Sequence, residues 1–287
     1  MLPVSTPHVA PVRPTALVTG ASSGIGLAVA RLLVAHGHRV VGTSRDPDRI
    51  ADADRVAGVE YRALDLDDLA GVTALGADLA RDGVEVDVLV NNAGESQCGA
   101  LEELPLPEVE RLFRVNVLGP VHLTQLLVPG MRERGRGRVV MVGSMLASFP
   151  LAYRSSYVAS KAAIKGFAEA ARFELAPHGV WLTTVEPGSV ATGISGRRTI
   201  HSPGGSPYAA GLRQMLGRLD AAERDGVSAE RVARTVLRAV QADAPVPTYA
   251  VGSGAPAVFA LRRALPAAVV ERVVARRFGL GPRGVRA

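Results

Sequence analysis

The segment from Ser144 to Lys161 places a serine, a tyrosine and a lysine at spacings that suit proton transfer. Tyr157 and Lys161 are four residues apart, so on a helix their side chains would share one face. A free tyrosine titrates near ~10, too high for efficient proton exchange at neutral pH, and a neighbouring ammonium favours the phenolate. The chain has only two lysines, Lys161 and Lys165. The spacing therefore predicts that Tyr157 acts as a general acid or base.

Two further polar residues could complete such a site. Ser144 ends a predicted strand at 138–144 and could donate to a carbonyl oxygen on which negative charge develops. Asn116 lies in a predicted helix at 107–131, where its amide could order a water that links the lysine to solvent. Each residue also has a purely structural interpretation: Tyr157 as a half-buried aromatic, Ser144 as a cap and Asn116 as a polar core group.

These residues need a scaffold that brings distant segments together. Short, nearly continuous apolar runs alternate with longer segments whose apolar residues recur three and four apart. This alternation indicates parallel strands buried on both faces and joined by right-handed helical crossovers. The predicted fold class is α/β, a single Rossmann-type, doubly wound parallel sheet flanked by helices. The expected strands are 15–20, 39–45, 59–65, 86–92, 138–144 and 180–188, and the expected helices are 24–36, 67–82, 107–131 and 155–177.

The chain shows no linker within residues 13–255, which predicts one catalytic domain over that range. Residues 1–12, rich in proline, are expected to be a disordered leader. After the sixth predicted strand, residues 193–226 mix glycine, proline and serine before helix-like sequence. A long insertion at a strand end is typical of a lid over a substrate site. No further acid or base stands out within this lid.

The C-terminal segment carries a last predicted strand within 242–252 and a basic helical tail at 256–287. A helix is expected to open near Pro266, with four valines on one side. Packing in the core or in an oligomer is the main interpretation of this tail, and a membrane-surface or partner helix is the alternative. On the main interpretation, its deletion would alter assembly or solubility and leave the chemistry intact.

A glycine-rich turn lies between the first predicted strand and the first predicted helix. Glycine permits the backbone angles of a tight turn and a close approach to a diphosphate. The free N–H groups and the dipole of the following helix attract the anion. Its place within a βαβ pattern makes the turn a predicted dinucleotide site. The residues concerned are Gly20, Ser22, Ser23, Gly24, Ile25 and Gly26.

The end of the second predicted strand indicates which nicotinamide cofactor is preferred. A carboxylate there would accept from the ribose 2′-hydroxyl of NAD, whereas a cation would neutralise the 2′-phosphate of NADP. Ser44 is neutral and Arg45 follows it, which favours NADP(H) over NAD(H). Asp46 comes next, however, and Arg45 could be an exposed loop arginine. Asp65, before Leu66 at the third strand end, could accept from the adenine amino group or cap the next helix.

Together these motifs resemble the short-chain dehydrogenase/reductase family, in order from about residue 13 to 192. The motifs are the glycine turn, Asn91-Asn92-Ala93-Gly94, Asn116, Ser144, Tyr157-x-x-x-Lys161 and Pro187-Gly188. The resemblance implies that Tyr157 is the acid/base and that Lys161 also holds the nicotinamide ribose. It implies that Ser144 positions the substrate and that Asn116 completes a proton relay. The other implied cofactor contacts are Asn91, Ala93 and Gly94 on the adenosine side, and Pro187, Gly188, Val190 and Thr192 beside the nicotinamide.

The resemblance implies a reversible carbonyl reductase or alcohol dehydrogenase, in which NADPH delivers hydride to a carbonyl carbon and Tyr157 protonates the oxygen. Beyond residue 192, the chain is more loosely similar to a hydroxysteroid- and retinol-dehydrogenase-like branch, which suggests a small-molecule hydrophobic carbonyl or alcohol substrate, specifically a bulky alcohol or ketone. Family members commonly form homodimers or homotetramers through helices near 107–131 and 155–177. An NAD(P)-binding epimerase or dehydratase is one alternative, and a non-catalytic nucleotide-sensing protein is another.

Composition excludes several other classes. Hydrophobic residues make up 47% of the chain and charged residues 21%, which is typical of a globular protein, and no apolar run is long enough to span a bilayer. Prolines interrupt the N-terminus, which argues against a signal peptide, and the single cysteine, Cys98, excludes an internal disulfide. A cytoplasmic enzyme is expected.

The net charge of +6 comes mainly from scattered arginines interspersed with acidic residues. Solvated surface charge is therefore expected rather than a nucleic-acid partner, and a contact of the basic tail with an anionic surface is the alternative. The six histidines do not cluster with carboxylates in the sequence. A phenol acid and a serine donor would also make a Lewis-acid metal redundant, so no metal is expected.

Overall fold

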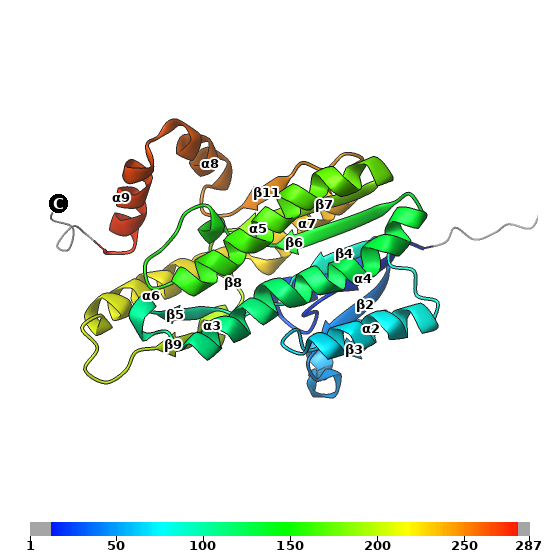
Figure 1. Ribbon diagram of the computed structural model, residues 1–287, viewed down its shortest axis with the longest axis horizontal. Coiled ribbons are helices and arrows are strands. Elements are labelled where there is room, and N and C mark those ends of the chain that lie inside the picture. Colours follow the sequence, from blue (N-terminus) through cyan, green and yellow to red (C-terminus); the bar gives the residue numbers. More distant parts are fainter. Residues whose placement is uncertain (1–12, 281–287) are drawn as a thin grey trace, which may run out of the picture.

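The computed structural model describes residues 13–280, in which seven parallel strands form one sheet with helices on both faces (Figure 1). The expected leader at 1–12 and the last seven residues of the tail lie outside the described residues. The strand order is β11-β7-β6-β4-β1-β2-β3. The strands are β1 (Thr15–Val18), β2 (Arg39–Ser44), β3 (Val59–Ala63), β4 (Val88–Asn91), β6 (Gly137–Val142), β7 (Val180–Pro187) and β11 (Thr248–Val251). The predicted α/β fold class is confirmed.

Alternation of side chains along the strands creates two separate cores. On β1, Ala16 and Val18 pack in one cluster, whereas Leu17 packs in the other. Because successive side chains of a strand point to opposite faces, an almost wholly apolar strand contributes side chains to both cores. Helices α1 (Gly24–Ala35) and α7 (Ala229–Gln241) cover the first face. Helices α2 (Leu69–Arg81), α4 (Gly119–Glu133) and α5 (Ser155–Leu175) cover the second.

The helix expected at 107–131 is divided into three parts. Helix α3 (Leu106–Phe113) is followed by a π-helical turn (Arg114–Leu118), which continues directly into α4. A π-turn inserts one residue into the helical ladder, and such turns occur often at functional sites. This π-turn contains Asn116, which the sequence predicts to be part of the catalytic site.

The lid at 193–226 has regular structure of its own. Strand β9 (Thr199–His201) pairs with β5 (Gln97–Gly99), and β10 (Val227–Ser228) pairs with β8 (Val190–Ala191). Helix α6 (Ala209–Arg224) buries Leu212, Met215 and Leu219. The lid is therefore held to the body by the β9–β5 pairing and by a small core that α6 shares with Cys98 and Leu151. The short 3-10 turns of the structure are Pro47–Arg49, Asp52–Asp54, Leu101–Glu103, Met145–Ala147, Ala176–His178 and Ile194–Arg197.

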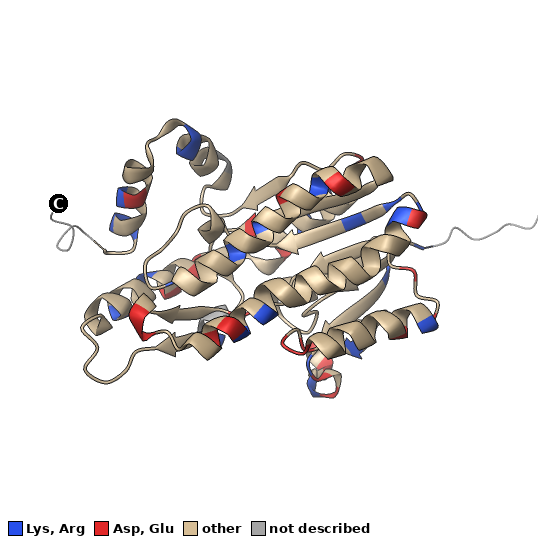
Figure 2. Cartoon of the chain, in the orientation of Figure 1, with Lys and Arg blue, Asp and Glu red and all other residues tan. Residues whose placement is uncertain are grey.

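Two helices follow the last strand, α8 (Ala255–Ala264) and α9 (Ala267–Arg277). Helix α8 lies near β11, and α9 extends toward α6 at the end of the molecule that carries the lid (Figure 1). Pro266 precedes the first turn of α9, as the sequence predicted, because proline is tolerated at a helix start. Figure 2 shows that the positions of cationic and anionic residues are dispersed over most helices, with cationic residues frequent on α8 and α9. No helix within residues 13–280 combines the length and apolar character needed to cross a bilayer.

Candidate active site

A cleft of about 650 Å³ lies along the carboxyl ends of the central strands. Ligands of open parallel sheets bind at this edge, and the volume is in the range of a small-molecule site. Most residues predicted from the sequence line it. From the cofactor set these are Gly20, Ser22, Ser23, Gly24, Ile25, Arg45, Asp65, Leu66, Ala93, Gly94, Pro187, Gly188, Val190 and Thr192, and from the catalytic set Ser144, Tyr157 and Lys161.

The glycine turn has the shape that a diphosphate requires. Gly20 adopts φ +68° and Gly24 φ +54°, conformations that side chains with a Cβ rarely adopt. Gly26 does not line the cleft; a Cβ there would lie 2.1 Å from the Gly20 carbonyl oxygen, so its absence lets α1 pack against the turn. No side chain caps the α1 N-terminus at Ser23, which leaves its N–H groups free for an anion. The turn therefore fits a dinucleotide.

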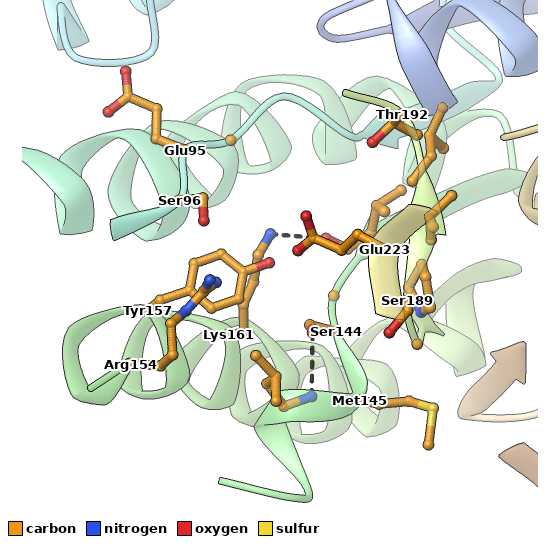
Figure 3. Close-up of a pocket in the computed structure, with 18 of the residues that line it drawn as sticks. Glu95, Ser96, Ser144, Met145, Arg154, Tyr157, Lys161, Ser189, Thr192 and Glu223 are labelled. Atoms are coloured by element: carbon orange, nitrogen blue, oxygen red, sulfur yellow. Dashed lines mark hydrogen bonds between the residues drawn. The ribbon is translucent and has the colours of Figure 1, made fainter. Parts of the chain in front are cut away.

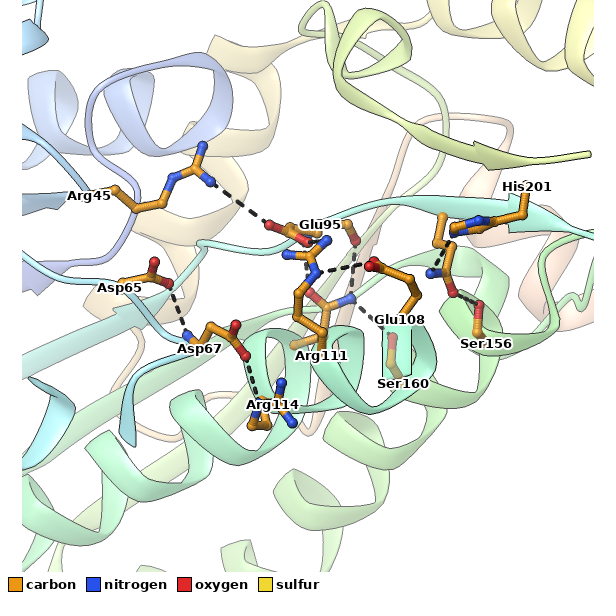
Figure 4. Close-up of polar contacts among 12 residues, drawn as sticks. Arg45, Asp65, Asp67, Glu95, Glu108, Arg111, Arg114, Ser156, Ser160 and His201 are labelled. Atoms are coloured by element: carbon orange, nitrogen blue, oxygen red, sulfur yellow. Dashed lines mark hydrogen bonds and ion pairs between the residues drawn. The ribbon is translucent and has the colours of Figure 1, made fainter. Parts of the chain in front are cut away.

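Arg45 and Asp46 have different environments, which bears on the choice of cofactor. Arg45 lines the cleft and is mostly exposed, and among residues 13–280 its one ion pair is a long contact of 3.9 Å to Glu95 (Figure 4). Asp46 accepts from the Asp48 N–H and pairs with Arg49 at 3.1 Å. Asp46 therefore stabilises its own 3-10 turn and is absent from the cleft wall, while the Arg45 guanidinium remains available to a phosphate.

The alternative that Asp65 caps the next helix is wrong. Asp68 caps α2, because its carboxylate accepts from the Ala70 N–H at 3.0 Å. Asp65 accepts from the Asp67 N–H at 3.0 Å and lines the cleft, where Leu66 accompanies it (Figure 4). Its second carboxylate oxygen has no partner among the described residues, which is compatible with a contact to an adenine amino group.

One residue of the Asn91-to-Gly94 motif points away from the cleft. The Asn91 amide is buried beneath α4, where it donates to Thr124 Oγ1 at 3.0 Å. Our expectation that Asn91 lines the adenosine side is therefore not supported by its side chain. Asn92 lines the cleft instead and donates to the Thr19 carbonyl oxygen at 3.0 Å, which ties the end of β4 to the glycine turn. The cause is strand parity, since neighbouring side chains face opposite sides.

Tyr157, Lys161 and Ser144 meet at the centre of the cleft (Figure 3). Tyr157 and Lys161 occupy successive turns of α5, and the Lys161 Nζ lies 5.9 Å from the centroid of the Tyr157 ring. The ammonium is buried and donates to the Val142 carbonyl oxygen at 3.0 Å, which fixes its position. The Tyr157 hydroxyl has no hydrogen-bond partner among the described residues. It is free to meet a substrate oxygen.

Ser144 has the structural role that its sequence position suggested, and it also lies where the predicted chemical role requires it. Its Oγ accepts from the Leu146 N–H at 3.1 Å and so caps the short turn after β6. The same hydroxyl lines the cleft, and its hydrogen remains available for donation. The cap orients the hydroxyl, so the structural role supports the chemical one.

Asn116 is buried beside the cleft and does not line it. Its Nδ2 donates to the Glu95 carbonyl oxygen and to Ser160 Oγ, both at 3.1 Å, and its Oδ1 accepts from the Glu95 N–H at 2.8 Å (Figure 4). Both amide hydrogens are therefore used in fixing the π-turn and the segment after β4. A Cβ added to Gly94 would lie 3.0 Å from Asn116 Oδ1 and 3.5 Å from Lys161 Nζ, so Gly94 separates the two groups.

The second lysine of the chain, Lys165, is partly buried and forms an ion pair with the buried carboxylate Glu186. Lys165 Nζ lies 2.9 Å from Glu186 Oε1 and donates to Ser148 Oγ at 2.9 Å. Glu186 is fully buried and immediately precedes Pro187, so the pair connects α5 to the cofactor side of the cleft. Burial raises the pKa of Glu186 above its ordinary value, and the Lys165 ammonium opposes this effect.

Several residues of the cleft were not found by sequence reasoning. Arg154, Arg197 and Glu223 line it together with much of α8 and α9, including Leu261, Leu265, Val270, Val273, Val274 and Phe278. The C-terminal helices thus form a wall of the site, which revises the expectation that they serve only core or oligomer packing. The lid carboxylate Glu223 likewise revises the expectation that no further acid or base lies in the lid. For Arg197, the only local signal was its place in a glycine-rich segment.

No metal-binding cluster of three or more His, Cys, Asp or Glu side chains occurs in the part of the chain that the structure describes.

Comparison with known proteins gives consistent matches. The family model for short chain dehydrogenases matches residues 14–202. The chain is 37% identical over 188 residues to the uncharacterized oxidoreductase YusZ of Bacillus subtilis, covering 62% of this chain and 66% of that protein. It is 30% identical over 226 residues to 3-ketodihydrosphingosine reductase of Bacteroides thetaiotaomicron, covering 78% and 82% respectively.

Solved structures also match the fold. A short-chain dehydrogenase from Streptomyces avermitilis superposes with a TM-score of 0.79 at 34% identity, over 96% of this chain and 100% of that one. The closed form of serine dehydrogenase complexed with NADP+ superposes with a TM-score of 0.69 at 26% identity, over 83% and 94%.

Proposed function

The chain belongs to the short-chain dehydrogenase family, and we propose that it is an NADP(H)-dependent oxidoreductase that interconverts a hydrophobic ketone or aldehyde with its alcohol. The observation that carries this proposal is the free Tyr157 hydroxyl in the cleft, with the Lys161 ammonium beside its ring. Ser144 presents its hydroxyl to the same cleft. A general acid, a fixed cation and a hydrogen-bond donor are the groups that carbonyl reduction requires.

Each residue has a defined task in the proposed mechanism. The bound nicotinamide supplies the hydride in reduction and accepts it in oxidation. Ser144 donates to the substrate oxygen and orients it, while Tyr157 transfers its proton to that oxygen as negative charge develops there. The positive charge of Lys161 stabilises the resulting phenolate, and its hydrogen bond to Val142 holds it in place. Asn116 acts indirectly, because it fixes the backbone on which the cleft is built.

NADP(H) is proposed over NAD(H) because of the contrast between Arg45 and Asp46. A mostly exposed guanidinium at the end of β2 would form charge-assisted hydrogen bonds with a 2′-phosphate. The nearby carboxylate that would select a ribose hydroxyl is engaged by Arg49 and the Asp48 N–H. The structural neighbour serine dehydrogenase was solved with NADP+, which is compatible with this preference.

The apolar character of one cleft wall supports a hydrophobic substrate. Phe149 from the turn after β6, Val258 from α8 and Val270 from α9 face the same space. Burial of each methylene of a ligand against such a wall contributes ~0.8 kcal/mol. The 3-ketodihydrosphingosine reductase relative is named for a ketone with a long alkyl chain, which agrees with this interpretation.

The helices α4 and α5 offer a surface for self-association. Among the exposed large apolar side chains, Phe167 and Phe173 lie on α5 and Leu118 lies at the start of α4. Exposed aromatic residues on a helical face favour a protein interface. We propose a homodimer or homotetramer through this face. Sedimentation of the wild-type and of Phe173→Asp would test it, since a monomeric wild-type protein would contradict the proposal.

A second candidate function is favoured by Glu223, whose carboxylate lines the cleft. A second acid/base group beside the cofactor would suit an epimerase or a dehydratase that regenerates its nicotinamide in each cycle. The two candidates differ in stoichiometry, because only the oxidoreductase consumes one cofactor for each product formed.

The experiment that tests the proposed function is an absorbance assay at the reduced-nicotinamide band. Purified enzyme is mixed with NADPH or NADH and a panel of steroidal, long-chain and short-chain ketones and aldehydes. We expect stoichiometric oxidation of NADPH, with kcat/KM increasing with the apolar area of the ketone. Binding of NADPH without oxidation across the panel would favour a nucleotide-sensing protein, and product formation without net oxidation would favour the epimerase or dehydratase.

A further inference from the structure

A buried arginine stands against the ring of the proposed acid. Arg154 immediately precedes α5, three residues before Tyr157, and its residue is only 3% exposed. The guanidinium carbon lies 4.2 Å from the centroid of the Tyr157 ring. Figure 3 shows the guanidinium in front of that ring, and Arg154 lines the same cleft. The arginine is therefore at the reacting end of the site.

The hydrogen-bonding capacity of Arg154 is largely unused within the protein. Its Nη1 donates to Cys98 Sγ at 3.5 Å, and its Nε has no partner among the described residues. Burial raises the pKa of the Cys98 thiol, so the sulfur remains protonated and is only a weak acceptor. Arg154 also forms no ion pair with any carboxylate in residues 13–280. Burial of an unpaired cation is costly, so a missing acceptor is expected.

One oxygen of the Glu223 carboxylate, which faces the same part of the cleft, is already paired. Glu223 Oε1 accepts from Arg198 Nη2 at 2.7 Å, and Arg198 is in turn paired with Asp220 at 2.7 Å. Glu223 forms no ion pair with Arg154, and its Oε2 has no partner among the described residues. The polar end of the cleft therefore combines an unsatisfied donor with a negative charge nearby.

We propose that Arg154 is a specificity-determining residue that donates to a second oxygen of the substrate, located close to the reacting carbonyl. This inference rests on the proposed function, because it assumes that a carbonyl oxygen meets Tyr157. The substrate class is then a ketone with an adjacent acyl oxygen rather than a simple hydrocarbon ketone. The Glu223 carboxylate repels a second anion, so a neutral ester, thioester or amide carbonyl is favoured over a free carboxylate.

Three probe ketones of equal chain length separate these cases: an ethyl 3-oxoalkanoate, the corresponding 3-oxoalkanoate anion and a 2-alkanone. Arg154→Leu removes the donors and keeps an apolar stem, whereas Arg154→Lys retains the charge. Because a keto ester is intrinsically more reactive, the diagnostic quantity is the change that each substitution causes in the kcat/KM ratio of keto ester to alkanone. We expect Arg154→Leu to lower this ratio about 10- to 100-fold and Arg154→Lys to recover part of it.

Arg172→Leu is the matched control, because Arg172 lies on α5 and, like Arg154, stacks on an aromatic ring, Trp181 at 4.7 Å, but does not line the cleft. It should leave the ratio unchanged. If Arg154→Leu lowered kcat/KM equally for the keto ester and the alkanone, the proposal would be overturned, because a purely structural role affects both probes alike. If Arg154→Leu instead lowered only the kcat/KM ratio of the 3-oxoalkanoate anion to the alkanone, the second oxygen would belong to a carboxylate, and the proposed preference for a neutral acyl oxygen would be overturned.

A binding measurement keeps this test independent of turnover. In the Tyr157→Phe background, the NADPH-loaded protein is titrated with the keto ester and the fluorescence of the reduced cofactor is followed. We expect Arg154→Leu to weaken this binding about 10-fold or more while the affinity for NADPH is unchanged. Unchanged keto-ester affinity would contradict the role of Arg154. A wild-type enzyme that binds the keto ester but reduces no ketone would count against the proposed function alone.

Discussion

Arg197 Nη1 donates to Ser23 Oγ at 2.9 Å, although the two residues are 174 positions apart in the chain. Ser23 lies at the N-terminus of α1, where the glycine turn would hold the diphosphate, and Arg197 belongs to the lid. Both residues line the cleft. The contact places an exposed arginine beside the predicted anion site. It therefore connects the lid to the glycine turn.

Substitution of Arg197 with Ala should weaken the binding of NADPH and of NADH equally. The diphosphate is common to NADPH and NADH, so loss of one charge-assisted contact should raise each Kd about 5- to 20-fold. The Kd values are measured by quenching of intrinsic fluorescence, and cofactor protection of the lid is followed by limited proteolysis. Arg213→Ala, an exposed arginine on α6 outside the cleft, is the control. A loss restricted to one cofactor would disagree with a diphosphate contact.

Replacement of Arg45 with Ala should instead discriminate between the cofactors. We expect the Kd for NADPH to rise about 10- to 100-fold, because only NADPH carries the 2′-phosphate, and the Kd for NADH to change less than ~2-fold. Arg31→Ala serves as the control, since Arg31 is an exposed arginine on α1 that does not line the cleft. Equal losses for both cofactors would remove the case for recognition of the 2′-phosphate.

The ion pair of Glu186 and Lys165 predicts a pH-dependent contribution to stability. The folded-state pKa of Glu186 is raised from 4.5, mainly by desolvation, so the folded protein binds this proton more tightly than the unfolded chain. Its stabilising contribution is therefore fully present below pH 4.5 and is lost as the pH rises through the raised value. Urea unfolding should show the free energy of unfolding of the wild-type decreasing over this window relative to Glu186→Gln.

The control for this measurement is Glu169→Gln, because Glu169 is a more exposed and more distant partner of the same lysine, at 3.9 Å. The difference in the free energy of unfolding between Glu169→Gln and the wild-type should vary little over the same pH window. If the difference in the free energy of unfolding between wild-type and Glu186→Gln were independent of pH, the prediction would be contradicted, because Glu186 would then have the same pKa in the folded and the unfolded chain.

Much of the fold could be predicted because its signals are local. Strands such as β1 are apolar on both faces, and Gly20 and Gly24 have the backbone angles that the glycine turn indicated. Tyr157 and Lys161 share a helix, so their spacing in the sequence determines their spacing in space. Features that depend on helical or strand period and on turn geometry were therefore accessible without a structure.

Other parts of the site depend on tertiary packing that has no local signature. The parity of β4 decides that Asn92 faces the cleft and Asn91 the core, and a shift by one residue would reverse them. Arg154 resembles any polar residue before a helix until its burial is known. The contribution of α9 also required the structure, because a valine stripe predicts an apolar contact without identifying its partner.

The most direct measurement of the central claim is a single-turnover comparison of wild-type and Tyr157→Phe enzyme. NADPH-loaded protein is mixed with a ketone that the wild-type reduces, and oxidation of the cofactor is followed by its absorbance. We predict that Tyr157→Phe lowers the rate of this step about 10²- to 10⁴-fold, with the Kd for NADPH changed less than ~2-fold. A near-normal rate in Tyr157→Phe would show that the proton reaches the substrate oxygen from another group.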